Sequence, residues 1–398
     1  MQNSVLNERA LKAGRKRALF GEDIDLEEYG ESPESTAELN EADRRALLDV
    51  GIQENERSGT YVQMDSSVMQ EFTDQEGIEV MGIGKALKRY DWLRDYWWKA
   101  VEVDQDKYTA YAQLHEPRGY FIRALPGSKG KFPVQACLYM KSSNAVQGVH
   151  NVLIAEEGSQ LDIITGCAVG EKSQNGVHVG ISEFFIKKNA TMTFTMIHGW
   201  DESISVRPRS GAVIEENGTF LSNYVNMKKT KSIQMYPTSY CNGKNSIARY
   251  STVLAASEGS NIDVGSRAVL RGEGSRTEMI SRGISTGGNV YLRGDIRGYG
   301  SNVKGHLECR GMLLEERGRI YSIPELTATH RDLELSHEAA IGKIAEEEIY
   351  YLMSRGLSEE EAAAIIVRGF LNVDIRGLPE SLDREIKRVI ETGLSSMM

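Results

Sequence analysis

The sequence predicts a mainly β protein, in which a parallel β-helix is flanked by an N-terminal α/β region and a C-terminal helical domain. From Gly119 to about Leu335, apolar and polar residues alternate with a period of two, which is typical of strands. A short unit recurs through this stretch at intervals of about 30 residues. After Leu335 the apolar residues return to the 3.6-residue period of helices. We therefore divide the chain into residues 1–118, 119–335 and 336–398.

The recurring unit consists of an apolar pair, a few mostly polar residues, a Gly or Asn, and an alternating strand. Gly and Asn tolerate the positive φ that a tight corner requires, so they are expected at the corners of stacked coils. The marker positions step by 31, 29, 41, 29 and 30, and we attribute the long step to a loop inserted around 237–244. The markers are Gly158, Asn189, Gly218, Gly259, Gly288 and Gly318.

Stacked units place aliphatic side chains in ladders that face the inside of the coil. We predict one such core along the whole coil. Its predicted members are Val152, Ile154, Phe184, Ile186, Val213, Val253, Ile284 and Leu313.

The first region is predicted to be partly helical. Asn40 can cap a helix over 41–50, and Gly51 can end it. Residues 77–81 are predicted to form a strand, and residues 83–100 a helix rich in Trp and Tyr. This aromatic density favours packing against a neighbouring surface over stacking on a ligand.

The third region is predicted to contain three helices. The first has an apolar face that includes Ile341 and Ile344, and a capping box of Ser358 and Glu361 begins the second. The third follows Pro379, with Leu382, Ile386, Val389 and Ile390 at helical spacing. These helices are expected to cap the open end of the coil, to dock another protein, or to do both.

Bulk composition excludes several classes of protein. A net charge of -10 and a pI near 5.4 argue against a nucleic-acid partner, which requires a basic face. We find no signal peptide and no 18-residue apolar stretch, so we expect a cytoplasmic protein without a membrane partner. Four widely spaced cysteines fit reduced thiols better than a disulfide framework.

Cys309 and the pair His337-Glu338 are the first candidates for chemistry. Thiolate, imidazole and carboxylate groups are ligands that iron and zinc accept, and these residues lie about one repeat apart. The alternatives are that Cys309 is a buried small hydrophobe and that Ser336 caps a helix whose first turn carries Glu338.

Cys167 and His198 are the second candidates. Each falls nine residues after its marker, so the two are expected to stack in one column of the coil. The alternative is that Cys167 and His198 only fill the core and have no chemical role. We find no P-loop, no HExxH motif and no nucleophile elbow, and so nothing that identifies a self-contained enzyme.

The C-terminal region resembles the SufB/SufD family, the scaffold subunits of the SUF iron-sulfur cluster assembly machinery. The resemblance rests on 337–344, on 351–357 and on 360–370, and it extends more weakly upstream to about residue 75. It implies a right-handed parallel β-helix, a transient iron-sulfur cluster built at the interface of two subunits, and an assembly scaffold that is not itself an enzyme. It also implies a sulfur donor protein and a SufC-type ATPase, which hydrolyses ATP and docks on the C-terminal helices. The residues predicted to bind the ATPase are Ile349, Leu352, Ile365, Ile366 and Phe370.

The resemblance also implies roles for single residues. Cys309 corresponds to the cluster-building cysteine of SufB-type members, and His337 and Glu338 to the family's His-Glu-Ala motif. Cys167 resembles the cysteine at the sulfur entry point. His198 and Trp200 fit a tunnel-lining segment that commonly reads Gln-Asn-Trp, although His198-Gly199 replaces Gln-Asn here.

Other features are closer to SufD, including Ser336 before the histidine and Ile341-Gly342 after it. A chain with features of both could form a homodimer that does the work of the SufB and SufD pair, and the complex is a candidate for binding reduced flavin. Two alternatives are a SufD-like structural partner without cluster chemistry and a β-helix carbohydrate-active enzyme, which would be expected to carry a secretion signal.

Overall fold

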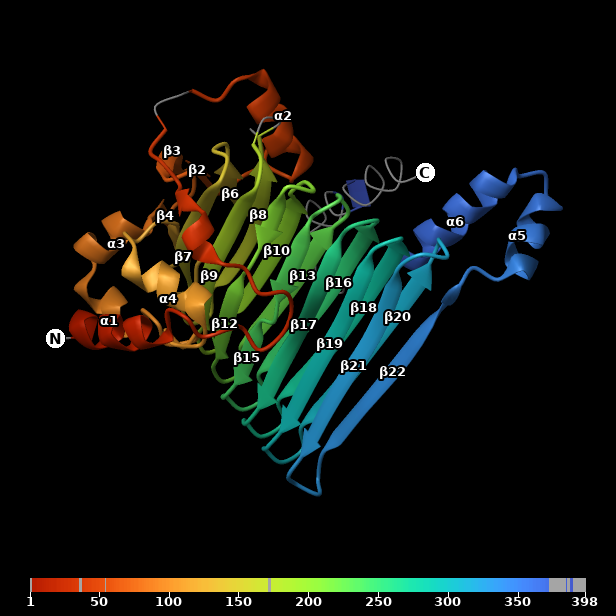
Figure 1. The fold of residues 1–398 in the computed structure, drawn as a ribbon. Coiled ribbons are helices and arrows are strands. Elements are labelled where there is room, and N and C mark those ends of the chain that lie inside the picture. The colour runs from red at the N-terminus through yellow and green to blue at the C-terminus, as the bar shows by residue number, and fades with distance from the viewer. Residues whose placement is uncertain are drawn as a thin grey trace.

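The computed structural model describes residues 2–35, 38–53, 55–170 and 173–371, together with residues 384, 387 and 388. Two long sheets face each other and form a parallel β-solenoid of about eight turns (Figure 1). Helices cover its N-terminal end and follow its last strand (Figure 1). The predicted parallel β-helix with flanking helical segments is therefore confirmed.

One sheet has twelve strands, which are paired in parallel except for β4 with β5. Its strands are β1 (Gly30–Glu31), β4 (Ile78–Gly82), β5 (Tyr120–Ala124), β7 (Ala145–Ala155), β9 (Gly176–Ile186), β11 (Ile204–Val206), β12 (Arg209–Ile214), β14 (Ser232–Met235), β15 (Thr238–Cys241), β17 (Asn261–Leu270), β19 (Asn289–Gly298) and β21 (Arg319–Ala328). The predicted strand at 77–81 corresponds to β4.

The other sheet has ten strands in the order β22-β20-β18-β16-β13-β10-β8-β6-β2-β3, and only β2 with β3 is antiparallel. They are β2 (Gly59–Met64), β3 (Ser67–Thr73), β6 (Val134–Met140), β8 (Gln160–Val169), β10 (Thr191–Gly199), β13 (Thr219–Asn226), β16 (Ile247–Ser257), β18 (Arg276–Thr286), β20 (Lys304–Leu313) and β22 (Glu334–Lys343).

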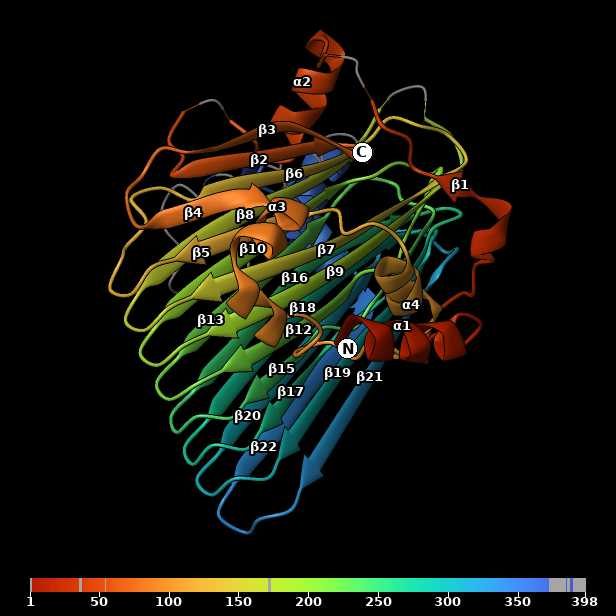
Figure 2. The ribbon, with the colours of Figure 1, turned by 90° about the vertical axis from the view of Figure 1, so that its left-hand side faces the viewer.

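Helices lie at both ends of the solenoid. Figure 2 shows α1 and α4 side by side over the first turns, and the two helices contact each other. None of the described helices is long and apolar enough to span a bilayer. The helices are α1 (Gln2–Ala13), η1 (Leu26–Glu28), α2 (Glu41–Asp49), α3 (Ile83–Arg89), η2 (Asp91–Asp95), α4 (Lys107–Leu114), α5 (Glu346–Met353) and α6 (Glu359–Leu371).

The corners of the solenoid are regular, and the predicted insertion around 237–244 is wrong. That stretch contains β15, which pairs with β12 and β17. The turns that lead from the twelve-stranded to the ten-stranded sheet carry positive φ at residues 28 to 31 positions apart, without a gap. The first three markers of the sequence pattern lie at or next to this corner. The later markers lie at or next to the opposite corner of each turn, where Gly259, Gly287 and Gly318 have positive φ, and this change of corner produced the apparent long step. In the turns that lead from the twelve-stranded to the ten-stranded sheet, the residues with positive φ are Gly158, Asn189, Asn217, Asn245, Gly274 and Asn302.

The core is divided between the two faces of the sheets. Of the eight predicted interior residues, Phe184 and Ile186 lie in the cluster inside the solenoid. Val152 and Ile154 are buried on the outer face beneath the N-terminal helices, and Val213 packs there half-buried. Val253 and Ile284 belong to a third, outer cluster that includes α6, and Leu313 is half-buried. Because side chains alternate along a strand, Val152, Ile154, Val213, Val253 and Ile284 face outward while their neighbours fill the interior. Leu313 is in register with Ser285 and with the interior residue Ala256, so it faces inward.

The helix predicted over 83–100 is broken. α3 ends at Arg89, because Tyr90 is extended, and η2 follows. The backbone N–H groups of Trp98, Lys99 and Ala100 then donate to the buried carboxylate of Glu183 at 2.6–2.7 Å. This carboxylate holds the segment in a turn, and the aromatic residues pack on the outer face of β7 and β9 as predicted. The helix predicted over 41–50 is confirmed as α2, and Asn40 caps it as predicted; the structure adds that Asp43 completes a capping box with Asn40.

The last strand runs further than expected. Ser336, His337 and Glu338 lie within β22, so the alternative in which Ser336 caps a helix is wrong. The strand region therefore extends past the predicted boundary at residue 335. The capping box of Ser358 and Glu361 is formed. The helix predicted after Pro379 lies outside the described residues, apart from isolated positions.

Candidate functional site

Cys167 and His198 stack as predicted. They are register partners on the neighbouring strands β8 and β10, and both face the inside of the solenoid. Each side chain is nearly inaccessible to solvent. Burial raises the pKa of the Cys167 thiol and lowers the pKa of His198, so both groups are neutral near neutral pH.

Trp200 follows β10 and is fully buried in the same interior cluster. Its ring centroid lies 6.0 Å from that of His198 and 4.9 Å from that of His178 on β9. His178 is a residue that our reading of the sequence missed. Its place in the alternating run from Val177 to Ile181 was the available signal, because alternate residues of such a strand face the interior.

Strand register connects this end of the solenoid to Cys309. Counting from β20 back to β8, the inward-facing partners of Cys309 form one column: Ser281, Thr252, Tyr224, Met196 and Thr165. Cys167 and His198 lie in the next inward column, two residues further along each strand. The two columns touch, because the Tyr224 hydroxyl is 2.9 Å from His198 Nδ1. Tyr224 is the second residue that sequence reasoning missed.

The interior beside this column is not completely filled. A cavity of about 30 Å³ is lined by residues of both sheets, among them Met196, Tyr224, Tyr250 and Thr252. Five strand steps separate β8 from β20, which corresponds to about 24 Å at the usual spacing between strands. A small group that moved from Cys167 to Cys309 would therefore travel along the interior of the solenoid.

Cys309 faces inward from β20 and is 1% exposed. Burial raises the pKa of its thiol, and the Ser322 hydroxyl and the Arg282 cation partly offset that effect. The other two cysteines are also buried. Cys241 faces the interior, whereas Cys137 belongs to an outer cluster.

The structure brings His337, but not Glu338, to the face that carries Cys309. On β22 the partners of Leu307 and Cys309 are His337 and Ala339, so His337 lies diagonally across from Cys309 on the inward face. Glu338 is the partner of Glu308 on the opposite face, where its Oε1 accepts from Arg310 Nη2 at 3.2 Å. Within the described residues, no three His, Cys, Asp or Glu side chains are grouped to hold a metal ion.

The end of the solenoid near Cys309 is open. β22 is the last strand of its sheet, and β21 pairs only with β19 among the described strands. Figure 1 shows both strands at the end opposite the N-terminal helices. Tyr321 and Leu326 of β21 and Ile341 of β22 are more than a third exposed. Such unpaired edges are able to add strands from another chain.

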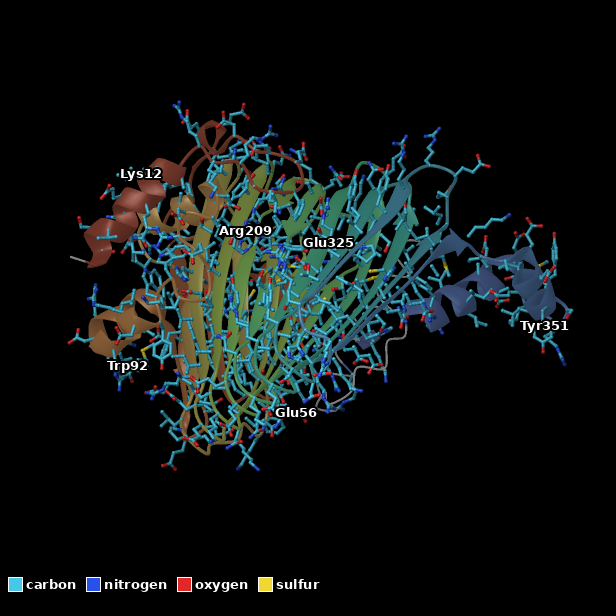
Figure 3. The ribbon with its side chains drawn as sticks, turned by 90° about the horizontal axis from the view of Figure 1, so that it is seen from below. Lys12, Glu56, Trp92, Arg209, Glu325 and Tyr351 are labelled. Carbon is cyan, nitrogen blue, oxygen red and sulfur yellow. The ribbon has the colours of Figure 1, made fainter. Side chains whose placement is uncertain are left out.

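The C-terminal helices extend beyond this edge, and Figure 3 shows Tyr351 at the outer tip of α5. No residue of α5 is buried, and Ile349 and Leu352 are half-exposed. Ile365 of α6 is 45% exposed and Ile366 half-buried, whereas Phe370 packs in part against the outer core. All five residues predicted to bind a partner are thus at least partly exposed.

Comparison with known proteins identifies the family. A family model described as "SUF system FeS cluster assembly, SufBD core domain" matches residues 138–370. The chain is 49% identical, over 98% of both chains, to an iron-sulfur cluster assembly SufBD family protein of Methanothermobacter thermautotrophicus (strain Winter). A SufBD family protein of Archaeoglobus fulgidus is 52% identical over 91% of this chain and 98% of its own. The iron-sulfur cluster assembly protein SufB of Bacillus subtilis is 28% identical over 90% of this chain and 80% of its own. The chain belongs to the SufBD family of iron-sulfur cluster assembly proteins.

Proposed function

We propose that this chain is a scaffold subunit on which an iron-sulfur cluster is assembled. In this proposal Cys167 receives sulfur from a donor protein, the sulfur moves along the interior of the solenoid, and Cys309 uses it with iron to build a nascent cluster. The register that places both thiols in adjacent inward columns, joined by His198 and Tyr224, carries the proposal. Among the described residues of β20 and β22, Cys309 and His337 are the only metal-binding side chains that face inward, so further ligands are expected from a second subunit.

Replacement of Cys309 tests the proposal directly. Cys309→Ala in the purified complex is expected to abolish anaerobic cluster reconstitution, measured as iron and acid-labile sulfide per protomer. Cys137→Ala is the matched control, because Cys137 is equally buried but faces away from the interior. Undiminished cluster uptake by Cys309→Ala would remove that residue from the proposal.

The second subunit is proposed to be another copy of this chain, paired through β21 and β22. The open edges and the exposed Ile341 support this arrangement. Ile341→Asp is expected to convert a dimer to a monomer in light scattering, because a buried unpaired charge is costly at an interface. A monomeric mass for the unaltered chain together with its ATPase would exclude the homodimer.

The partner ATPase is proposed to dock on α5 and α6 and to supply the energy that opens the subunit interface. The exposed apolar surface of these helices, which includes Tyr350 and Tyr351 of α5 and Ile365 of α6, supports a docking role. Ile365→Asp is expected to abolish co-purification with a SufC-type ATPase. Leu19→Asp, at another exposed apolar site, is the control.

A second candidate function is that of a SufD-like structural partner without cluster chemistry. The nearly complete burial of Cys309 favours it, because a free cysteine in a packed core needs no reactive role. In that case Cys309→Ala would lower thermal stability but leave the cluster content of the complex unchanged. The reconstitution experiment therefore separates the two candidates.

A further inference from the structure

The N-terminal helices leave a cleft between them. Its volume is about 490 Å³, which lies within the range of about 300–1,000 Å³ that is usual for small-molecule sites. α1, α3 and α4 pack on the outer face of β7 and β9, and their residues line most of the cleft (Figure 2). The cleft therefore lies outside the solenoid and is separate from the interior that holds Cys167 and Cys309.

One wall of the cleft is apolar. Leu87 of α3 is half-buried there, and Leu114 at the end of α4 is 40% exposed. Trp97 also lines the cleft and is 8% exposed, and its ring stacks on the buried ring of His150 with 3.7 Å between the two centroids. Because this stack fixes the indole, the wall is preformed and offers apolar surface to the body of a ligand.

Side-chain amides from α1 and α4 supply hydrogen-bond donors to the cleft. Gln113 Oε1 accepts from Trp98 Nε1 at 2.6 Å, and because an indole N–H can only donate, this contact fixes the orientation of the Gln113 amide. Gln113 Nε2 donates to Asn7 Oδ1 at 2.7 Å and to Asn3 Oδ1 at 3.2 Å. Both asparagine oxygens are therefore engaged, whereas their NH2 groups, which can only donate, have no acceptor in the described part of the chain.

The lining of the cleft carries a net positive charge. Lys88 of α3 is exposed, and no carboxylate among the described residues pairs with it. Arg94 is a second cation on the lining. Glu116 is the carboxylate on the lining, and it already pairs with Arg118 at 2.7 Å. The first turn of α1, which carries Asn3, has no acidic residue. A ligand with a negative charge is therefore favoured in this cleft.

We infer that this cleft binds a small organic anion. The carboxylate or phosphate group of the ligand is held by the ammonium group of Lys88 and by the amide NH2 groups of Asn3 and Asn7, because hydrogen bonds to a charged group are stronger than those between neutral groups. The apolar body of the ligand lies against Leu87 and Leu114, where it removes exposed apolar surface from water. This role does not depend on cluster assembly and goes beyond the proposed function.

Pyridoxal 5′-phosphate is the probe for this site. It combines a planar ring and a phosphate group with an aldehyde, which condenses with a lysine amine and releases water, and borohydride reduces the resulting imine to a stable amine. In the purified full-length chain, Lys88 is expected to be labelled at a lower probe concentration than Lys85, as located by tandem mass spectrometry. Lys85 is the internal control, because it lies on the same helix and is already paired with Glu71.

Competition experiments identify what the cleft recognises. An excess of adenosine monophosphate or of octanoate, each an anion with an apolar body, is expected to protect Lys88 from the probe. Inorganic phosphate at the same concentration is expected to protect Lys88 much less, because it leaves the apolar wall uncovered. Protection by adenosine monophosphate alone would indicate a ligand with a ring, and protection by octanoate alone would indicate a ligand with an aliphatic chain.

Asn7→Asp tests the amide donors. The aspartate still offers an oxygen to Gln113, but it replaces the NH2 group by a negative charge. Labelling of Lys88 at low probe concentration is expected to fall about fivefold, the effect of two like charges about 4 Å apart in water. Asn242→Asp is the matched control, because Asn242 Oδ1 likewise accepts a hydrogen bond, from Arg271 Nη1 at 3.2 Å, and lies outside the cleft.

Several results would each overturn the inference. One is equal labelling of Lys85 and Lys88 at every probe concentration. Another is protection of Lys88 by the organic anions that is no stronger than protection by inorganic phosphate, since the apolar wall would then contribute nothing. A third is labelling of Lys88 in a folded Asn7→Asp variant to the same extent as in the unaltered chain. An equal loss of labelling in Asn242→Asp would also overturn it, because the effect would then not depend on the position of the added charge.

Discussion

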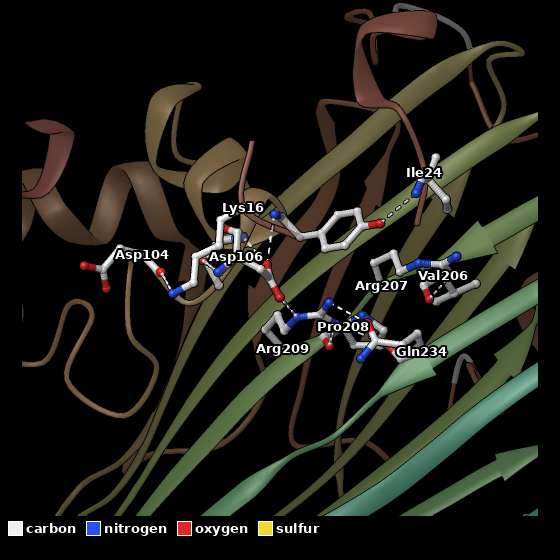
Figure 4. Close-up of polar contacts among 11 residues, drawn as sticks. Lys16, Ile24, Asp104, Asp106, Val206, Arg207, Pro208, Arg209 and Gln234 are labelled. Atoms are coloured by element: carbon white, nitrogen blue, oxygen red, sulfur yellow. Dashed lines mark hydrogen bonds and ion pairs between the residues drawn. The ribbon is translucent and has the colours of Figure 1, made fainter. Parts of the chain in front are cut away.

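Arg209 Nε donates a hydrogen bond to Asp106 Oδ2 at 2.6 Å, and both side chains are at most 3% exposed (Figure 4). Asp106 also caps α4, since its Oδ1 accepts from the backbone N–H groups of Tyr108 and Thr109. Arg209 donates further to backbone oxygens of Pro208 and Gln234. One buried ion pair therefore fixes the N-terminal helices to the solenoid at β12.

Loss of this pair is expected to release the N-terminal helices. Asp106→Ala leaves a buried guanidinium without its counter-ion and removes a helix cap, which together should cost about 3–5 kcal/mol. Hydrogen exchange should accelerate in α4 and α1 while the later strands stay protected. Asp104→Ala is the control, because Asp104 pairs with Arg9 at the surface, where such pairs contribute about 0–1 kcal/mol. Equal exchange in the two variants would show that the buried pair does not hold the helices.

The corner asparagines are expected to stabilise the stack in two separable ways. Asn217 has φ +53, and its Nδ2 donates to Asn189 Oδ1 at 3.0 Å, while Asn245 donates to Asn217. Asn217→Gly keeps the backbone conformation but loses hydrogen bonds worth about 0.5–1.5 kcal/mol each. Asn217→Ala adds about 1–2 kcal/mol of left-handed strain. The melting temperature should therefore be highest for the unaltered chain, lower for Asn217→Gly and lowest for Asn217→Ala. An Asn217→Ala variant as stable as Asn217→Gly would contradict this account.

These corners also explain what could be predicted from sequence. Period-two alternation and recurring Gly or Asn were sufficient to identify a parallel β-helix, and the equal spacing that put Cys167 beside His198 was correct. Spacing alone could not distinguish the two corners of each turn, since Gly218 and Gly259 belong to different ones. It also could not tell the inner from the outer face, because Val152 and Leu153 are both apolar and both buried. The outer residue, Val152, is apolar because the N-terminal helices pack on the outer face of β7.

The candidate site was predictable to a similar extent. Cys309 and His337 lie one turn apart on the same face, as their spacing suggested, but Glu338 alternates to the other face and pairs with Arg310. His178 and Tyr224 reach the site from other strands through the interior. Strand alternation predicts only that such residues face inward, and it does not say which residues of other strands they meet. Contacts made across the interior of a solenoid depend on register and ring orientation, which a spacing argument does not contain.

Acid is expected to destabilise the protein through its buried histidines. Burial lowers the pKa values of His150, His178 and His198 below the ordinary 6.5, and that of His178 to about 3. Below pH 6.5 the unfolded chain binds protons that the folded chain does not, so their contribution is complete above pH 6.5 and is lost as the pH falls toward 3. Each such histidine should lower the free energy of unfolding by about 1.4 kcal/mol per pH unit in that window.

Denaturant unfolding at pH 7.5, 6 and 5 measures this dependence. His178→Gln should reduce the slope by about one proton. A slope in His178→Gln equal to that of the unaltered chain would mean that His178 is already protonated in the folded protein.

Blocking the interior between the two cysteines is expected to uncouple sulfur loading from cluster assembly. Ser281 lies in the inward column between Thr252 and Cys309, so Ser281→Phe would place a ring in the proposed path. Cys167 should still gain sulfur from polysulfide, because it lies several strands away, but the iron and sulfide content of the reconstituted complex should fall at least tenfold. Ile280→Phe is the matched control, because Ile280 is the neighbour of Ser281 on β18 and its side chain faces the outside of the solenoid. Normal cluster content in a folded Ser281→Phe variant would mean that sulfur reaches Cys309 by a route outside the solenoid.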